Sequence, residues 1–142
     1  MNVASVRAAL QTTAQAVTTT AYSFPTSGVV LGVEHYLPSE DQWNSLASGR
    51  AKMFIQPVTF QVQAQTNIGF GNVPATLYFN LTKFTDTTLV NEEEFAASVA
   101  KAWLDASYVT NVSMGEWRYL PMDAGKKVIC HVTFTVQVML CL

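Results

Sequence analysis

The side chains that most often perform catalysis are few in this sequence, and their spacing matches no catalytic arrangement that we can identify. Cys130 and His131 are adjacent, but neighbouring residues on a strand point to opposite faces, so this thiol and this imidazole cannot act as a nucleophile–base pair. The other histidine, His35, has no His or Cys nearby at the spacing of metal ligands. Nucleophile-elbow, phosphate-loop and dinucleotide-binding motifs are all absent. We therefore expect a protein that is not an enzyme, with no catalytic residue, no metal and no cofactor.

Three consecutive carboxylates, Glu92 to Glu94, are a second place where chemistry could occur. Such a run can bind a metal ion or supply an acid and a base. However, Asn91 directly before it is a good helix N-cap, and negative side chains stabilise the positive end of a helix. We interpret the acidic run as a helix-terminal feature, and Glu40-Asp41 in the same way.

The segment from Ile68 to Gly71 has no simple structural explanation. We expect residues 66–72 to form a loop, in which Gly69 and Gly71 would let Phe70 project from a hairpin tip. An exposed apolar ring often marks a contact site. Alternatively, Phe70 folds back onto the sheet. We name Gly69, Phe70 and Gly71 as candidate partner-contact residues.

Two stretches, 2–19 and 91–105, repeat apolar residues at the three- and four-residue spacing of an amphipathic helix. A shorter helix is expected between Ser39 and Gly49. The apolar faces consist of Val3, Val6, Leu10 and Val17 in the first stretch and of Phe95, Ala96, Val99, Ala100 and Trp103 in the second.

The remaining chain is rich in predicted strands. In the strand 50–65, Met53 and Ile55 are apolar at odd positions and Val58 at an even one, which predicts a bulge or bend at the intervening Pro57, on a sheet edge. The last strand, 126–140, alternates between apolar and polar residues, with Ile129 and Met139 as apolar exceptions, and such alternation is typical of antiparallel sheets. The whole order predicts one α+β domain, 1–142, with a mainly antiparallel sheet and two amphipathic helices packed on one face. The other predicted strands are 28–36, 74–84, 108–112 and 116–121, with a turn at 123–125.

The low charge of the chain limits the partners it can have. Charged residues make up 13% of the sequence, against about 25% in an ordinary soluble domain. The formal net charge is −2, and no cluster of Lys and Arg exists that could grip DNA. No apolar run reaches the roughly 20 residues of a membrane span. Cys130 and Cys141 would lie about 36 Å apart on one strand, so we expect two free thiols.

The order of elements resembles the tail terminator proteins of long-tailed bacteriophages, the minor tail protein U-like family. The similar features are a leading helix (3–17), a long hairpin (50–84), an acidic-capped helix (91–104) and closing strands (116–140). The similarity spans nearly the whole chain but rests on length, element order and composition. No motif carries a functional residue over.

The resemblance implies a virion protein of the tail or neck, made in the host cytoplasm. Such a protein forms a homo-oligomeric, hexameric ring that caps the tail-tube protein and meets the head–tail connector protein. DNA passes through without sequence-specific binding, and no membrane is involved. The residues are compatible with this, because scarce charge lowers the cost of burying surface between subunits. We also expect a sheet with this long final strand to leave edge groups that a ring neighbour could pair or cover.

Two other classes remain open. Another phage tail or neck subunit, such as a tail-tube or decoration protein, would share this composition. A small-molecule-binding or catalytic domain would need a deep pocket with convergent polar groups.

Overall fold

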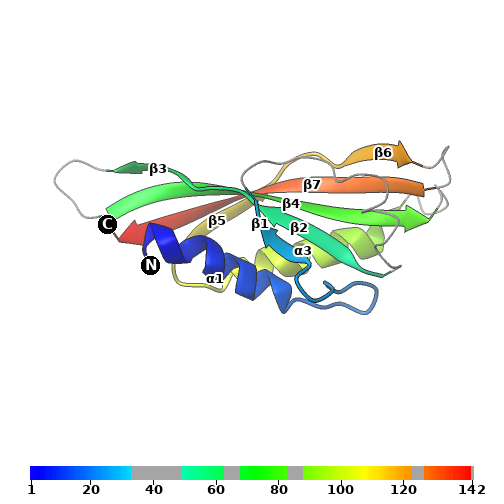
Figure 1. Ribbon diagram of the computed structural model, residues 1–142, viewed down its shortest axis with the longest axis horizontal. Coiled ribbons are helices and arrows are strands. Elements are labelled where there is room, and N and C mark those ends of the chain that lie inside the picture. The colour runs from blue at the N-terminus through cyan, green and yellow to red at the C-terminus, as the bar shows by residue number, and fades with distance from the viewer. Residues whose placement is uncertain (33–48, 63–67, 83–87, 123–126, 142) are drawn as a thin grey trace.

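The computed structural model describes residues 1–32, 49–62, 68–82, 88–122 and 127–141. Within them it has two helices and seven strands, and the strands form a single sheet (Figure 1). The α+β class is confirmed, and every strand pairing is antiparallel except that of β1 with β2. The elements are α1 (Val3–Gln15), β1 (Val29–Leu31), β2 (Ala51–Ile55), β3 (Thr59–Val62), β4 (Ile68–Thr82), α3 (Val90–Leu104), β5 (Val109–Met114), β6 (Arg118–Met122) and β7 (Lys127–Cys141).

Some predictions lie outside the described residues. These are His35, Glu40-Asp41, the short helix expected before Gly49, and the turn at 123–125.

The two longest strands, β4 and β7, form the centre of the sheet. They pair with each other along their whole length, from Ile68↔Cys141 to Thr82↔Lys127. The other side of β4 pairs with β2 and β3, and the other side of β7 pairs with β5 and β6. The final strand β7 is therefore not an edge of the described sheet, because two short strands pair with successive halves of its other side.

The phase change at Pro57 is confirmed by the pairing register. Ile55 lies opposite Ala75, whereas Thr59 lies opposite Asn72, so four steps along one side correspond to three along β4. One residue is therefore extra between β2 and β3. Pro57 lies in this break, where its missing N–H removes no ladder hydrogen bond.

The beginnings of the two helices differ in how they are capped. Asn2 caps α1 through a reciprocal capping box with Ser5, which satisfies two otherwise free backbone amides. The predicted N-cap of the second helix, Asn91, is wrong. α3 begins one residue earlier, at Val90, after Leu89 in the left-handed conformation with φ 52°.

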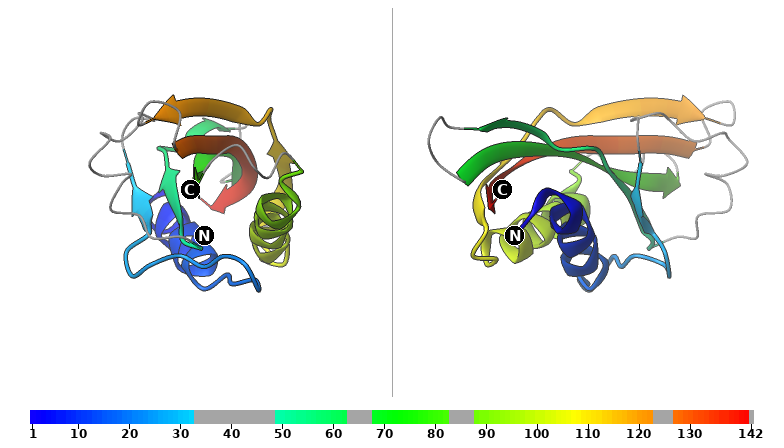
Figure 2. Two further views of the ribbon diagram at one scale, coloured as in Figure 1. Left: turned by 90° about the vertical axis from the view of Figure 1, so that its right-hand side faces the viewer. Right: turned by 60° about the vertical axis from the view of Figure 1, so that its left-hand side comes forward.

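Both helices contribute to the same core as one face of the sheet, and both lie on one side of it in Figures 1 and 2. The Trp103 indole N–H of α3 donates to the carbonyl oxygen of Leu10 in α1, at 3.0 Å. The Trp103 ring also meets Phe134 of β7 edge to face, with 5.4 Å between centroids. The core contains Val6, Leu10 and Ala14 of α1, Phe95, Ala96, Val99 and Trp103 of α3, Val73, Ala75, Leu77 and Phe79 of β4, and Cys130, Val132, Phe134, Val136, Val138 and Leu140 of β7.

Candidate functional site

The candidate contact residues Gly69, Phe70 and Gly71 lie in strand β4, not in a loop. Phe70 is opposite Gln61 of β3 on one side and opposite Met139 of β7 on the other. The predicted loop over 66–72 is therefore wrong from Ile68 onward. Glycine weakens a strand through its conformational freedom, but pairing partners on both sides of the backbone outweigh that preference.

Phe70 is nevertheless exposed, because its side chain lies on the outer face, the sheet face opposite the helices. It is 45% exposed, and its cross-strand partner Met139 is 39% exposed. Ile68, two residues away on the same face, is 42% exposed. We call Ile68, Phe70 and Met139 the outer patch. These three apolar side chains gather where β4 begins and β7 ends.

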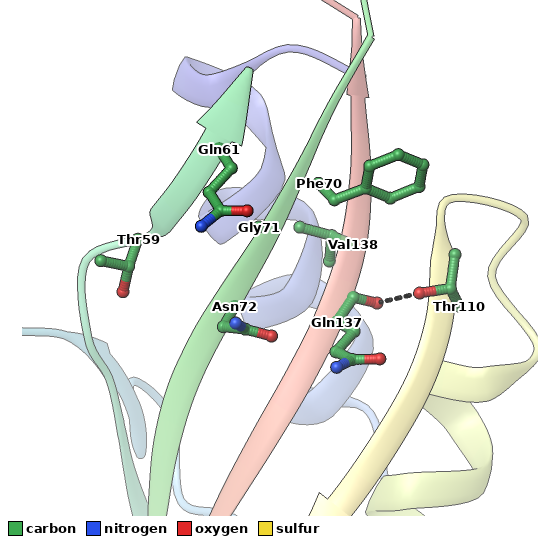
Figure 3. A pocket seen from close by; sticks show the side chains of 8 residues that line it. All are labelled: Thr59, Gln61, Phe70, Gly71, Asn72, Thr110, Gln137 and Val138. Atoms are coloured by element: carbon green, nitrogen blue, oxygen red, sulfur yellow. Dashed lines mark hydrogen bonds between the residues drawn. The ribbon is translucent and has the colours of Figure 1, made fainter. Parts of the chain in front are cut away.

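The surroundings of the patch are polar but uncharged. A hollow of about 650 Å³ runs across β3, β4, β7 and β5 beside Phe70 (Figure 3). Along it, the Thr110 hydroxyl donates to the carbonyl oxygen of Gln137 at 3.3 Å. None of the described residues that line the hollow is charged, so these residues offer phosphate or carboxylate ligands no ion pair. The lining residues are Thr59, Gln61, Phe70, Gly71, Asn72, Thr110, Gln137 and Val138.

The opposite end of the outer face is packed differently. Phe54, Tyr78 and Ile129 form a small second cluster there, and the Tyr78 ring lies 5.3 Å from that of His131. Burial raises the pKa of Tyr78 far above its ordinary value. The His131 imidazole therefore lies against the Tyr78 ring. In the same cluster, the Nζ atom of Lys52 lies 5.4 Å from the centre of the Phe54 ring.

Cys130 and His131 lie on opposite faces of β7, which is the geometry that strand alternation predicts. Cys130 belongs to the helix-side core. Burial, together with the negative charge of Glu92, raises the pKa of its thiol to about 12. A thiol with such a pKa is not a nucleophile at neutral pH. In the described ranges, no three His, Cys, Asp or Glu side chains gather closely enough to hold a metal ion.

Glu92 is a buried carboxylate that sequence reasoning placed at the surface of a helix end. It is only 3% exposed, whereas Glu93 and Glu94 are exposed. The Tyr22 hydroxyl donates to its Oε1 atom at 3.1 Å, while Oε2 has no hydrogen-bond partner among the described residues. The sequence could have predicted this burial, because Glu92 stands three residues before the core residue Phe95 and shares its helix face.

The two thiols are expected to differ in reactivity. Cys130 is buried and Cys141 is exposed, and both are free. A thiol-disulfide reagent such as DTNB should therefore modify one thiol per chain in the folded protein and two in denaturant. Cys141→Ser is the control, because it should remove the fast-reacting thiol and leave the slow one. Rapid modification of Cys130 in that variant would contradict the buried position.

No helix in the described ranges is long and apolar enough to cross a bilayer. Comparison with protein-family models and with curated protein sequences found no match to this chain.

Proposed function

We propose that this protein is a structural virion subunit, a tail terminator that assembles with identical copies into a ring. The ring would cap the tail tube and meet the head–tail connector. The observation that carries the proposal is the outer patch, with Phe70 at its centre. It is an exposed apolar surface on the one sheet face that the two packed helices leave uncovered.

Burial of this patch in a subunit contact is energetically favourable. Each square ångström of apolar surface removed from water contributes about 25 cal/mol. The neighbouring side chains, among them Gln61, Asn72 and Gln137, carry no charge. Amide side chains can both donate and accept, so an uncharged protein surface can satisfy their hydrogen bonds. A contact here therefore avoids the cost of desolvating ions.

The same features support the passage of DNA without tight binding. Affinity for nucleic acid depends on Lys and Arg side chains that neutralise phosphates, and none of the described residues that line the hollow is a Lys or an Arg. The formal net charge of −2 has the same consequence.

Two other hypotheses for the function have less support. A tail-tube or decoration subunit would use the same uncharged surface but would form a filament or a trimer. A small-molecule site needs polar groups that converge on a ligand, whereas the hollow beside Phe70 is lined by scattered amides and hydroxyls.

Oligomeric mass decides among these readings. We expect light scattering coupled to size exclusion to give one closed assembly, with the mass of six chains, over a wide concentration range. Negative-stain images should show a central pore. Open-ended polymers would support a tube protein and trimers a decoration protein. A monomer at every concentration would overturn the proposal.

A further inference from the structure

Within the described ranges the sheet has four edge strands, β1, β3, β5 and β6. Backbone N–H and C=O groups along an edge can pair with another chain, and proteins normally block such edges with proline, charge or a covering element. The four edges of this sheet are not blocked equally.

The edge at β1 is covered by side chains of α1. Gln15 accepts from the Val29 N–H through Oε1 (2.9 Å), and Gln11 donates to the Val29 carbonyl (2.9 Å). Arg7 donates to two main-chain oxygens at the ends of β1 and β2, at 2.8 and 2.7 Å. The three side chains are one helical turn apart, so they follow the strand as a row. α1 therefore occupies the place where a further strand would pair.

The edge at β6 contains a proline. The hydrogen bond from the Gly115 N–H to the Thr133 carbonyl (2.9 Å) shows that odd-numbered residues of β7 bond toward β5 and β6. Pro121 lies opposite Val128, an even-numbered residue, so its nitrogen faces away from β7. An incoming strand would find no donor there.

The edge at β5 has one irregularity, a register shift to β7 between Val109 and Asn111, and it is regular from Asn111 to Met114. Its six residues include no proline and no charged side chain. Val112 and Met114 lie opposite even-numbered residues of β7. Since only the odd-numbered residues of β7 bond toward β5, the amides of Val112 and Met114 point away from β7. In the part of the chain that the structure describes, no strand pairs with this side of β5.

The strand β3 is the complementary edge at the same end of the sheet. It also lacks proline and charge, and within the described ranges its far side pairs with no strand. Directions alternate across β3, β4, β7 and β5. Therefore β3 and β5 run in opposite directions. A second copy rotated about an axis parallel to the strands keeps its strand directions, so its β3 would lie antiparallel to β5 of the first copy.

We propose that β5 of each subunit pairs antiparallel with β3 of a second copy, so that the sheet continues from subunit to subunit. This inference rests on the proposed ring, and it defines the contact as head-to-tail, the type that closes under cyclic symmetry. Phe70 lies opposite Gln61 of β3, so the outer patch borders this contact.

Met114→Pro tests the pairing. It removes an outward amide without removing a ladder hydrogen bond to β7, and the Met114 side chain is exposed. We expect this variant to have the mass of a monomer where the wild type has the mass of the assembly. The unfolding free energy of the monomer should change little. Tyr119→Pro is the matched control, because it removes an outward amide from the β6 edge that already contains Pro121. It should assemble normally.

Mixing experiments identify the partner edge. Val62→Pro, which removes an outward amide from β3, should also be monomeric alone. Mixed with Met114→Pro, it should form one-to-one pairs and nothing larger, since each variant keeps one intact edge. In the wild-type assembly, hydrogen exchange at the amides of Val112 and Met114 should be slow.

The outcomes separate this inference from the proposed function. A monomeric wild-type protein overturns both. A wild-type ring with fast exchange at Val112 and Met114, or a Met114→Pro variant that still forms the ring, overturns the strand pairing alone.

Discussion

Trp103→Ala should lower the free energy of unfolding by about 3–5 kcal/mol, the range for removal of a large buried aromatic side chain. Trp103 is fully buried and is the largest side chain of the core. Its ring contacts Phe134 in the sheet, and its N–H binds the Leu10 carbonyl of the other helix. The substitution therefore opens a cavity where both helices and the sheet meet. It also removes the hydrogen bond that the indole N–H donates to the Leu10 carbonyl oxygen.

Urea unfolding followed by circular dichroism measures this effect, at one fixed protein concentration because assembly adds to apparent stability. Trp103→Phe separates the two contributions, since it retains most of the ring and loses the hydrogen bond. The neighbouring Leu104 is exposed, so Leu104→Ala should change stability by no more than about 0.5 kcal/mol. Equal losses in Trp103→Ala and Leu104→Ala would contradict the packing of α3.

The sequence predicted the helices well because their signal is local. Burial of Val6, Leu10, Phe95, Val99 and Trp103 follows from spacing along each segment. The break at Pro57 was predictable for the same reason, since a change of alternation is visible within a few residues.

Non-local pairing was not predictable. Glycines in 68–72 suggested a loop, and only β3 and β7 on either side make this segment a strand. The parallel pairing of β1 with β2 and the central position of β7 depend on contacts between distant segments. No propensity along a single segment encodes them.

The candidate site was therefore predicted only in part. The exposure of Phe70 was one of two alternatives that the sequence left open, and it was argued from a hairpin tip. The sheet instead adds two neighbours, Ile68 and Met139. Met139 is 69 positions further along the chain than Phe70, and along its own strand it is only an apolar residue that breaks the alternation. Cross-strand pairing converts that exception into part of a continuous apolar surface.

Phe70→Asp should abolish assembly while leaving the subunit folded. In a subunit contact, a carboxylate at this position would be buried among uncharged side chains with no cation to pair with, which is costly. We expect subunit affinity to fall about 100-fold or more, which corresponds to about 2.7 kcal/mol. Phe70→Ala should act in the same direction but more weakly, because it removes apolar contact without adding a charge. Since the ring is 45% exposed in the subunit, the unfolding free energy should change by less than about 1 kcal/mol.

Val90→Asp is the matched control for the charge itself. Val90 is 60% exposed and begins α3, away from the outer face, and an acidic residue is favourable at a helix N-terminus. This variant should assemble like the wild type when both are compared by light scattering. The patch would lose its role if Phe70→Asp kept the wild-type mass. If instead both variants lost assembly, added negative charge would explain the effect, and the position of Phe70 on the outer face would not.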